Sequence, residues 1–315
     1  MSEKLCAISI DLDPITAYYK IHGLGDPPRH LRSTIMLKVL PRFLELFELL
    51  NVRVTFFVVA SELEQNEEAI ALLKQAVDAG HEIANHTYHH PYDLCRLPEQ
   101  VIEQEIRRAH DLISDSLNVA PEGFRTPGYS TNANVMRVLA NMGYLYDSSM
   151  FPSAPYYAAK VAVMAGMSMR GRNSGAVLGD PRCLLAPTDP YRPDAKEPWK
   201  KGQCPVVELP VAVLPYSRLP AIGTLVAAGP RWLRGHLMKA MCKRSFFNFE
   251  LHGIDLADAI ADRIPTVLAG RQPDLRVPYA DKREIFRQTI EVLQREFEIV
   301  PLRDVGTTFQ REGTI

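Results

Sequence analysis

Residues 52–86 read VRVTFFVVASELEQNEEAIALLKQAVDAGHEIANH. The β-branched and aromatic run at 52–59 is typical of a buried strand. Residues 66–79 have the amphipathic spacing of a helix, and Gly80 is expected to end it. Residues 81–85 then predict a short strand that carries His86 at its end. A strand, a helix and a second strand in this order predict parallel strands joined by a crossover helix.

The same alternation extends in both directions from this unit. It predicts an α/β fold with parallel strands, and the pattern weakens only between 153 and 205, which we interpret as an insertion of loops and short elements. The predicted strands are 5–10, 52–59, 81–85, 144–146, 206–213, 246–251 and 299–302, and the predicted helices are 35–50, 66–79, 98–117, 132–142 and a terminal one at 282–297.

Composition limits the class of protein. The chain has 315 residues, 46% of them apolar and 23% charged, which is typical of a globular protein with a large core. Its net charge of −1 predicts no nucleic-acid partner. The first residues lack the cationic and long apolar regions of a signal peptide. Five scattered cysteines without a Cys-x-x-Cys spacing favour reduced thiols, so we expect a cytoplasmic protein.

Residues 85–91 read NHTYHHP and contain a histidine pair. His86 and His90 are separated by three residues, so one turn of helix or a tight loop can direct both imidazoles at one metal ion. The segment has no Glu after the first histidine, unlike a zinc-protease helix. A general base must therefore come from elsewhere in the chain.

Polar residues follow several predicted strands where those strands end. In barrels of alternating strands and helices, the carboxyl ends of the strands build the active site. Six such side chains from four segments are therefore expected to converge, namely Asp11, Asp13, His86, His90, Arg125 and His252.

The types of these side chains suit amide hydrolysis. A catalytic metal commonly has three protein ligands, which His86, His90 and one of the two aspartates can supply. The other aspartate is then free to act as a base toward water, and Arg125 can orient it and keep it ionised. A distant His252 can protonate the leaving amine.

Five segments, in this order, resemble the motifs of polysaccharide deacetylases of the NodB-homology type, carbohydrate esterase family four. They are residues 11–13, 86–90, 125–129, 146–149 and 251–252. The resemblance implies one domain over residues 1–315, folded as a distorted (β/α)7 barrel with an insertion at about 153–245 that holds loops, one strand and an amphipathic helix.

The resemblance also implies a role for each site residue. Asp11 would be the catalytic base, held by Arg125, and His252 the general acid. Asp13, His86 and His90 would bind a divalent metal, for which we expect zinc. The backbone N–H of Tyr129, in the turn that begins at Pro127, would bind the oxyanion, and Leu251 would line the acyl pocket.

Two departures from the family pattern widen the choice of substrate. Leu12 separates the two aspartates, which looks like the branch that contains deformylases of lipid-linked aminoarabinose and atypical peptidoglycan deacetylases. The tryptophan common in the fourth motif is missing. We therefore expect removal of an acetyl or formyl group from an N-acylated sugar or glycan. A deacylase of a lipid-linked sugar at the membrane surface and a catalytically silent sugar-binding barrel remain alternatives.

Residues 231–244 mix cations with Trp232, Leu233, Leu237 and Met238. Such a helix could lie on an anionic membrane at the inner face of the cell. We prefer a helix that packs its apolar side on the barrel, because most amphipathic helices do so.

Overall fold

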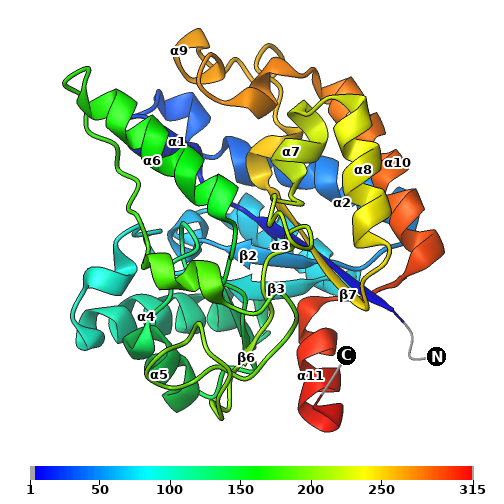
Figure 1. Cartoon of the computed structure of the whole chain (residues 1–315). Coiled ribbons are helices and arrows are strands. Elements are labelled where there is room, and N and C mark those ends of the chain that lie inside the picture. Colours follow the sequence, from blue (N-terminus) through cyan, green and yellow to red (C-terminus); the bar gives the residue numbers. More distant parts are fainter. Residues whose placement is uncertain (1–3, 314–315) are drawn as a thin grey trace.

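Eight strands form one parallel sheet in a computed structural model that describes residues 4–313 (Figure 1). The order is β6-β5-β4-β3-β2-β1-β7, and β8 pairs with β1. Residues 1–3, on which the expectation about a signal peptide partly rests, lie outside the described residues. The strands are β1 (Leu5–Asp11), β2 (Thr55–Val58), β3 (Glu82–Asn85), β4 (Gly123–Phe124), β5 (Tyr146–Asp147), β6 (Val207–Glu208), β7 (Phe246–His252) and β8 (Glu298–Ile299).

The sheet curls into a distorted barrel whose two end strands are β6 and β7. The chain after β6 closes much of the distance between them, because the Ala212 N–H donates to the Asn248 carbonyl at 3.2 Å. The Asn248 side-chain amide also donates to the carbonyls of Leu209 and Pro210. The predicted α/β class and distorted barrel are thus confirmed.

Helices cover the outside of this sheet (Figure 1). Side-chain caps start several of them; in α3, for example, the Asn66 side chain accepts the Ala69 N–H. The α-helices are α1 (Ile15–Ile21), α2 (Leu40–Leu50), α3 (Glu67–Asp78), α4 (Glu99–Leu117), α5 (Ala133–Asn141), α6 (Ala154–Ser168), α7 (Gly223–Ala228), α8 (Arg231–Met241), α9 (Thr266–Ala269), α10 (Tyr279–Glu296) and α11 (Leu302–Glu312). A π-helical turn at Ile35–Val39 leads into α2.

Alternation along β1 separates an apolar face from a polar one. Ile8 and Ile10 are fully buried in the main core between the sheet and the helices. Ala7, on the other face of the strand, packs with Phe57 and Tyr146 in a second core. Ser9 and Asp11 share that second face. The barrel interior therefore changes from apolar to polar toward the carboxyl ends of the strands.

The segment 153–245 corrects the sequence interpretation. It was expected to hold loops, one strand and one amphipathic helix, but it contains three helices, α6, α7 and α8. The pattern hid α6 because its residues are apolar on nearly all sides and so show no helical periodicity. The strand predicted at 206–213 is limited to Val207–Glu208, and α11 follows the last strand, so the helix at 282–297 is not terminal.

Helix α8 packs as the preferred interpretation expects. Leu237, Met238 and Met241 are buried, whereas the Trp232 side chain, in the first turn, is 73% exposed. Among the described helices, none combines the length and the apolar character needed to cross a membrane.

Candidate active site

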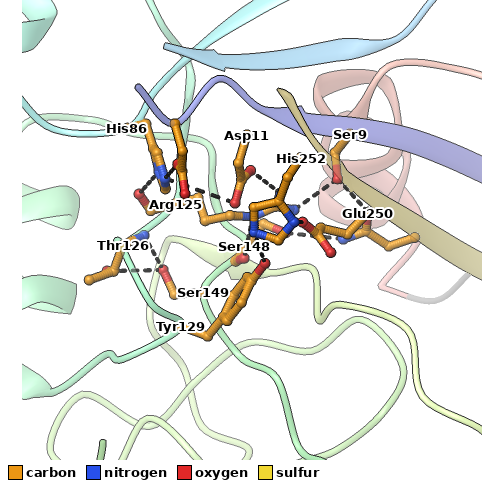
Figure 2. Close-up of polar contacts among 12 residues, drawn as sticks. Ser9, Asp11, His86, Arg125, Thr126, Tyr129, Ser148, Ser149, Glu250 and His252 are labelled. Atoms are coloured by element: carbon orange, nitrogen blue, oxygen red, sulfur yellow. Dashed lines mark hydrogen bonds and ion pairs between the residues drawn. The ribbon is translucent and has the colours of Figure 1, made fainter. Parts of the chain in front are cut away.

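The carboxyl ends of β1, β3, β4 and β7 bring the six predicted side chains together. Figure 2 labels four of them, Asp11, His86, Arg125 and His252. Asp11 ends β1 and pairs in register with His252, the last residue of β7. His86 directly follows β3, and Arg125 directly follows β4. All except His252 are almost completely buried, so their charges interact in a medium that screens them weakly.

Asp13, His86 and His90 form a cluster of three potential metal ligands. Asp13 Oδ1 lies 3.1 Å from His86 Nε2 and 3.0 Å from His90 Nε2. The His86 Nδ1–H donates to the Arg125 carbonyl at 2.8 Å, which leaves the Nε2 lone pair directed toward Asp13. Burial would raise the pKa of Asp13, but His90 and His86 hold it well below its ordinary value.

His90 gives this cluster its clearest sign of a missing partner. Within residues 4–313 neither ring nitrogen of this buried imidazole meets the geometry of a hydrogen bond, although Nε2 lies 3.0 Å from Asp13 Oδ1. An unsatisfied buried polar group is costly, and a cation between the two imidazoles and the carboxylate would satisfy all three. One carboxylate and two imidazoles therefore fit a divalent ion of the zinc type, held by Asp13, His86 and His90.

The loop that carries the two histidines has an uncommon backbone. Thr87 and His90 have φ values of 67° and 58°, in the left-handed region that L-residues seldom adopt. Two hydrogen bonds support it, because the Thr87 N–H donates to Asn85 Oδ1 at 2.8 Å and the His90 N–H donates to Thr87 Oγ1 at 3.1 Å. Asn85 and Thr87 thus fix the angle at which the imidazoles enter the site.

Arg125 holds Asp11 in place. Its guanidinium donates to Asp11 Oδ1 at 2.5 Å, and to Ser9 and Ser148 on its other edges. The guanidinium also stacks over the Phe57 ring, 4.1 Å from the centroid. Burial raises the pKa of Asp11, while the charges of Arg125 and His86 oppose that rise. Asp11 is consequently a fixed, desolvated carboxyl group, suited to accept a proton.

His252 lies between an acidic and a hydroxyl partner. Its Nδ1 forms an ion pair with the fully buried Glu250 at 2.9 Å, and its Nε2 lies 3.1 Å from the Tyr129 hydroxyl. Figure 2 shows the imidazole between these two side chains. Burial lowers the pKa of His252, but Glu250 outweighs it, so the pKa is raised well above the ordinary value. The Glu250 carboxylate therefore favours the protonated form of the imidazole.

Glu250 is a functional residue that the sequence interpretation missed. A signal was present, because Asn248, Glu250 and His252 alternate with apolar residues along β7. Polar residues at every second position of an otherwise buried strand indicate a polar interior face. Glu250 lies opposite Ser9 in the register of β1 and β7, one step below the pair of Asp11 and His252.

Three predicted substrate contacts lie less directly at the site. The Tyr129 N–H donates to the Thr126 carbonyl at 3.2 Å, within the turn that contains Pro127, and its role as an oxyanion donor stays a prediction. Leu251 is fully buried in the main core, and the cavity beside the site is lined without it or Pro127. Alternation explains this, because Leu251 points away from the face that carries Glu250 and His252.

A cavity of about 660 Å³ opens beside these groups. Asp11, Asp13, His86 and His252 line its polar end. Its other walls are mainly apolar and come from α6 and α7, with Ile222 and Ile254 between them. A volume of this size accommodates a small sugar or one part of a larger glycan.

The fold and the site together define a barrel whose strand ends gather three potential metal ligands, a buried carboxyl group paired with an arginine, and a histidine paired with a glutamate. Comparison with known proteins agrees with this class. The family model described as polysaccharide deacetylase matches residues 34–146. Over this segment, a little more than a third of its length, the chain is similar to the polysaccharide deacetylase family.

Two curated relatives illustrate the likeness. A peptidoglycan deacetylase of Helicobacter pylori is 29% identical over 159 residues, which cover 49% of this chain and 53% of the relative. Chitin deacetylase 1 of Cryptococcus neoformans is 32% identical over 103 residues, covering 33% of this chain and 21% of the relative. The chain thus spans about half or less of the length of these proteins.

Solved structures share the fold along nearly the whole chain. A Mycobacterium smegmatis protein described as a polysaccharide deacetylase superposes with a TM-score of 0.60 at 17% identity, covering 100% of this chain and 93% of that one. An allantoinase superposes with a TM-score of 0.56 at 14% identity, covering 98% and 90%. At these identities the likeness concerns the fold alone.

Proposed function

We propose that the protein is a metal-dependent hydrolase that removes an N-acyl group, acetyl or formyl, from an amino sugar. The observation that carries the proposal is the arrangement at one end of the cavity of the Asp13, His86 and His90 cluster, the pair of Asp11 and Arg125, and His252 paired with Glu250. The relatives named peptidoglycan deacetylase and chitin deacetylase support deacetylation of a glycan.

The residues divide the work of amide hydrolysis. A divalent ion at the Asp13 cluster would supply Lewis acidity toward the amide carbonyl and toward water. Asp11 accepts the proton of the attacking water, and Arg125 fixes the orientation of that carboxylate. His252 delivers its Nε2 proton to the departing nitrogen, and Glu250, paired with Nδ1, keeps the imidazole ring in its orientation.

Release of acetate or formate from N-acylated amino sugars tests the proposal. We expect release that a chelator abolishes and zinc restores. The Asp11→Asn variant should lose at least about a hundredfold in rate, since general acid–base groups contribute about 10²- to 10⁴-fold. Asp115→Asn, an exposed aspartate on α4, is the matched control. An unchanged rate in Asp11→Asn would show that the base is assigned wrongly.

A lipid-linked sugar is a second candidate substrate, favoured by the apolar walls of the cavity. Helix α6 contributes Ala159, Val163 and Met164 to them, and Val163 is also 56% exposed outside. An acyl chain could lie along this face. A screen of N-acetyl and N-formyl sugars, free and lipid-linked, would identify the substrate; faster turnover of the free sugars would remove this candidate.

We also propose that the protein works at the cytoplasmic face of the membrane. Its five cysteines are free thiols, as expected in a reducing compartment, and Trp232 is exposed beside Arg231 and Arg234. Flotation with anionic liposomes tests the membrane contact, and failure to float would argue against it.

A catalytically silent sugar-binding barrel is the remaining alternative. Such a protein would bind the N-acetyl and N-formyl sugars of the screen without releasing acetate or formate, so the screen separates it from a hydrolase.

A further inference from the structure

A second, smaller cavity of about 290 Å³ lies against the outer side of α6. Its charged walls come from three distant parts of the chain: Arg170 and Arg172 after α6, Arg271 after α9, and His22 at the end of α1. Hydrogen bonds hold these parts together, because the Ser174 hydroxyl donates to the Ile21 carbonyl at 2.7 Å. Figure 1 shows α1, α6 and α9 on the same side of the barrel.

The three arginines of this cavity, Arg170, Arg172 and Arg271, have no anionic partner. Within residues 4–313, none of them forms an ion pair with a carboxylate. Their hydrogen bonds within the described residues go to backbone carbonyls. Arg172 and Arg271 donate to that of His22, at 3.1 and 2.9 Å, Arg172 also to that of Gly23 at 3.3 Å, and Arg170 to that of Gly166 at 3.1 Å. Each guanidinium has five N–H donors, so most of them remain free.

Like charges are thus concentrated in one place. Desolvation lowers the pKa of Arg271, and the charge of Arg172 lowers it further. Burial lowers the pKa of His22, and both arginines act in the same direction. Such clustering is unfavourable without an anion, and it is not a general property of a chain with 36 basic and 37 acidic residues.

The arginine cavity adjoins the active-site cavity. His22 and Val163 line both. The His22 ring is bonded to Gln272 at 3.1 Å, and Gln272 also lines the active-site cavity. One molecule can therefore place an amide near His252 and an anionic group among the arginines.

We propose that Arg170, Arg172 and Arg271 form a binding site for a phosphate or diphosphate group carried by the substrate. Guanidinium groups bind phosphate oxygens by paired, charge-assisted hydrogen bonds, and three of them match the several oxygens of such a group. The inference rests on the proposed function, which supplies the N-acylated amino sugar that the active-site cavity would hold. The substrate is then an N-acylated amino sugar esterified with phosphate, rather than a neutral stretch of glycan.

Binding tests the anion site independently of catalysis. Titration calorimetry with pyrophosphate and with N-acetylglucosamine 1-phosphate should show binding that weakens as salt rises. Arg170→Gln and Arg271→Gln should each weaken it about tenfold or more, because a charge-assisted hydrogen bond is worth roughly a tenfold change in affinity. Arg170→Lys should recover part of the loss.

The exposed Arg295 on α10 supplies the matched control, since Arg295→Gln removes the same charge elsewhere. Circular dichroism spectra that match the wild type would establish that each variant is folded. The proposal is overturned if the wild-type protein binds neither probe, or binds them no more tightly than the Arg170→Gln, Arg271→Gln double variant.

Kinetics connect the anion site to the substrate. The wild-type enzyme should have a lower KM for N-acylglucosamine 1-phosphate than for the free N-acyl sugar, and Arg271→Gln should erase this difference in KM. Equal KM values in the wild type would refute a substrate phosphate. If no sugar is hydrolysed at all, the proposed function fails while the calorimetry still decides the anion site. Faster turnover of a lipid-linked sugar phosphate than of a soluble one would identify the lipid as the source of the phosphate.

Discussion

Glu250 should set the pH range in which His252 works. Replacing it by Gln preserves its shape but removes the charge 2.9 Å from Nδ1. At an effective dielectric constant of about 20, a charge pair at that separation attracts by roughly 6 kcal/mol. Since ~1.36 kcal/mol corresponds to one pH unit, its loss lowers the midpoint of His252 by at most about four pH units. Burial of the imidazole acts in the same direction.

The assay is the pH dependence of kcat/KM for acyl release. The basic limb reports loss of the proton from the general acid. We expect Glu250→Gln to move that limb down by about two pH units or more, because only the protonated imidazole can deliver a proton. Glu298→Gln, an exposed change on β8, should leave the profile unchanged.

A measurement without turnover separates this effect from a general loss of activity. In chelator-treated protein, the nitrogen chemical shifts of His252 report its protonation directly. The reasoning would be refuted if the basic limb and the His252 titration of Glu250→Gln both coincided with those of the wild type. That result would show that the Glu250 charge does not raise the pKa of His252.

Three further changes follow from the structure. His90→Ala should bind zinc much more weakly than the wild type in equilibrium dialysis, because it removes one of three ligands; equal zinc content would show that the site lies elsewhere. Burial lowers the pKa of His81 from 6.5 to about 4, and its Nδ1 accepts the Val54 N–H. Because only the unfolded chain binds a proton at His81 readily, the free energy of unfolding is highest above pH 6.5 and falls as the pH falls toward 4, by about 2 kcal/mol at pH 5. Urea midpoints should therefore drop over this range, and His81→Gln should make them less dependent on pH. Gly123→Ala would place a methyl group 2.0 Å from the Tyr146 ring and should destabilise the fold by about 1–3 kcal/mol, whereas Gly235→Ala, with open space in α8, should raise stability slightly.

Local signals sufficed for the elements that carry the site. The β-type run at 5–10 coincides with β1, the run at 52–59 contains the shorter β2, and the strand ends locate Asp11, His86 and His252. These residues are predictable because parallel strands necessarily bring their carboxyl ends to one edge. A resemblance in motif order then distinguishes the aspartates, which residue types alone leave interchangeable.

Features that depend on tertiary contacts were not predictable in this way. Helix α6 has no apolar stripe, since its sides face a cavity and the outside rather than a core. Leu251 lies beside the general acid in sequence but on the opposite face of its strand. The arginine cavity combines residues from positions 22, 170, 172 and 271, whose proximity only the folded chain reveals.

Helix α6 has a consequence for how large a substrate the enzyme can admit. None of its residues is fully buried, so little apolar area resists its detachment from the barrel. Local unfolding of this wall should be far easier than disruption of β1, and its amide protons should exchange with solvent long before those of the central strands. We therefore expect the α6 wall of the cavity to give way more readily than the walls built on the central strands, which would let a group wider than the resting cavity enter from this side.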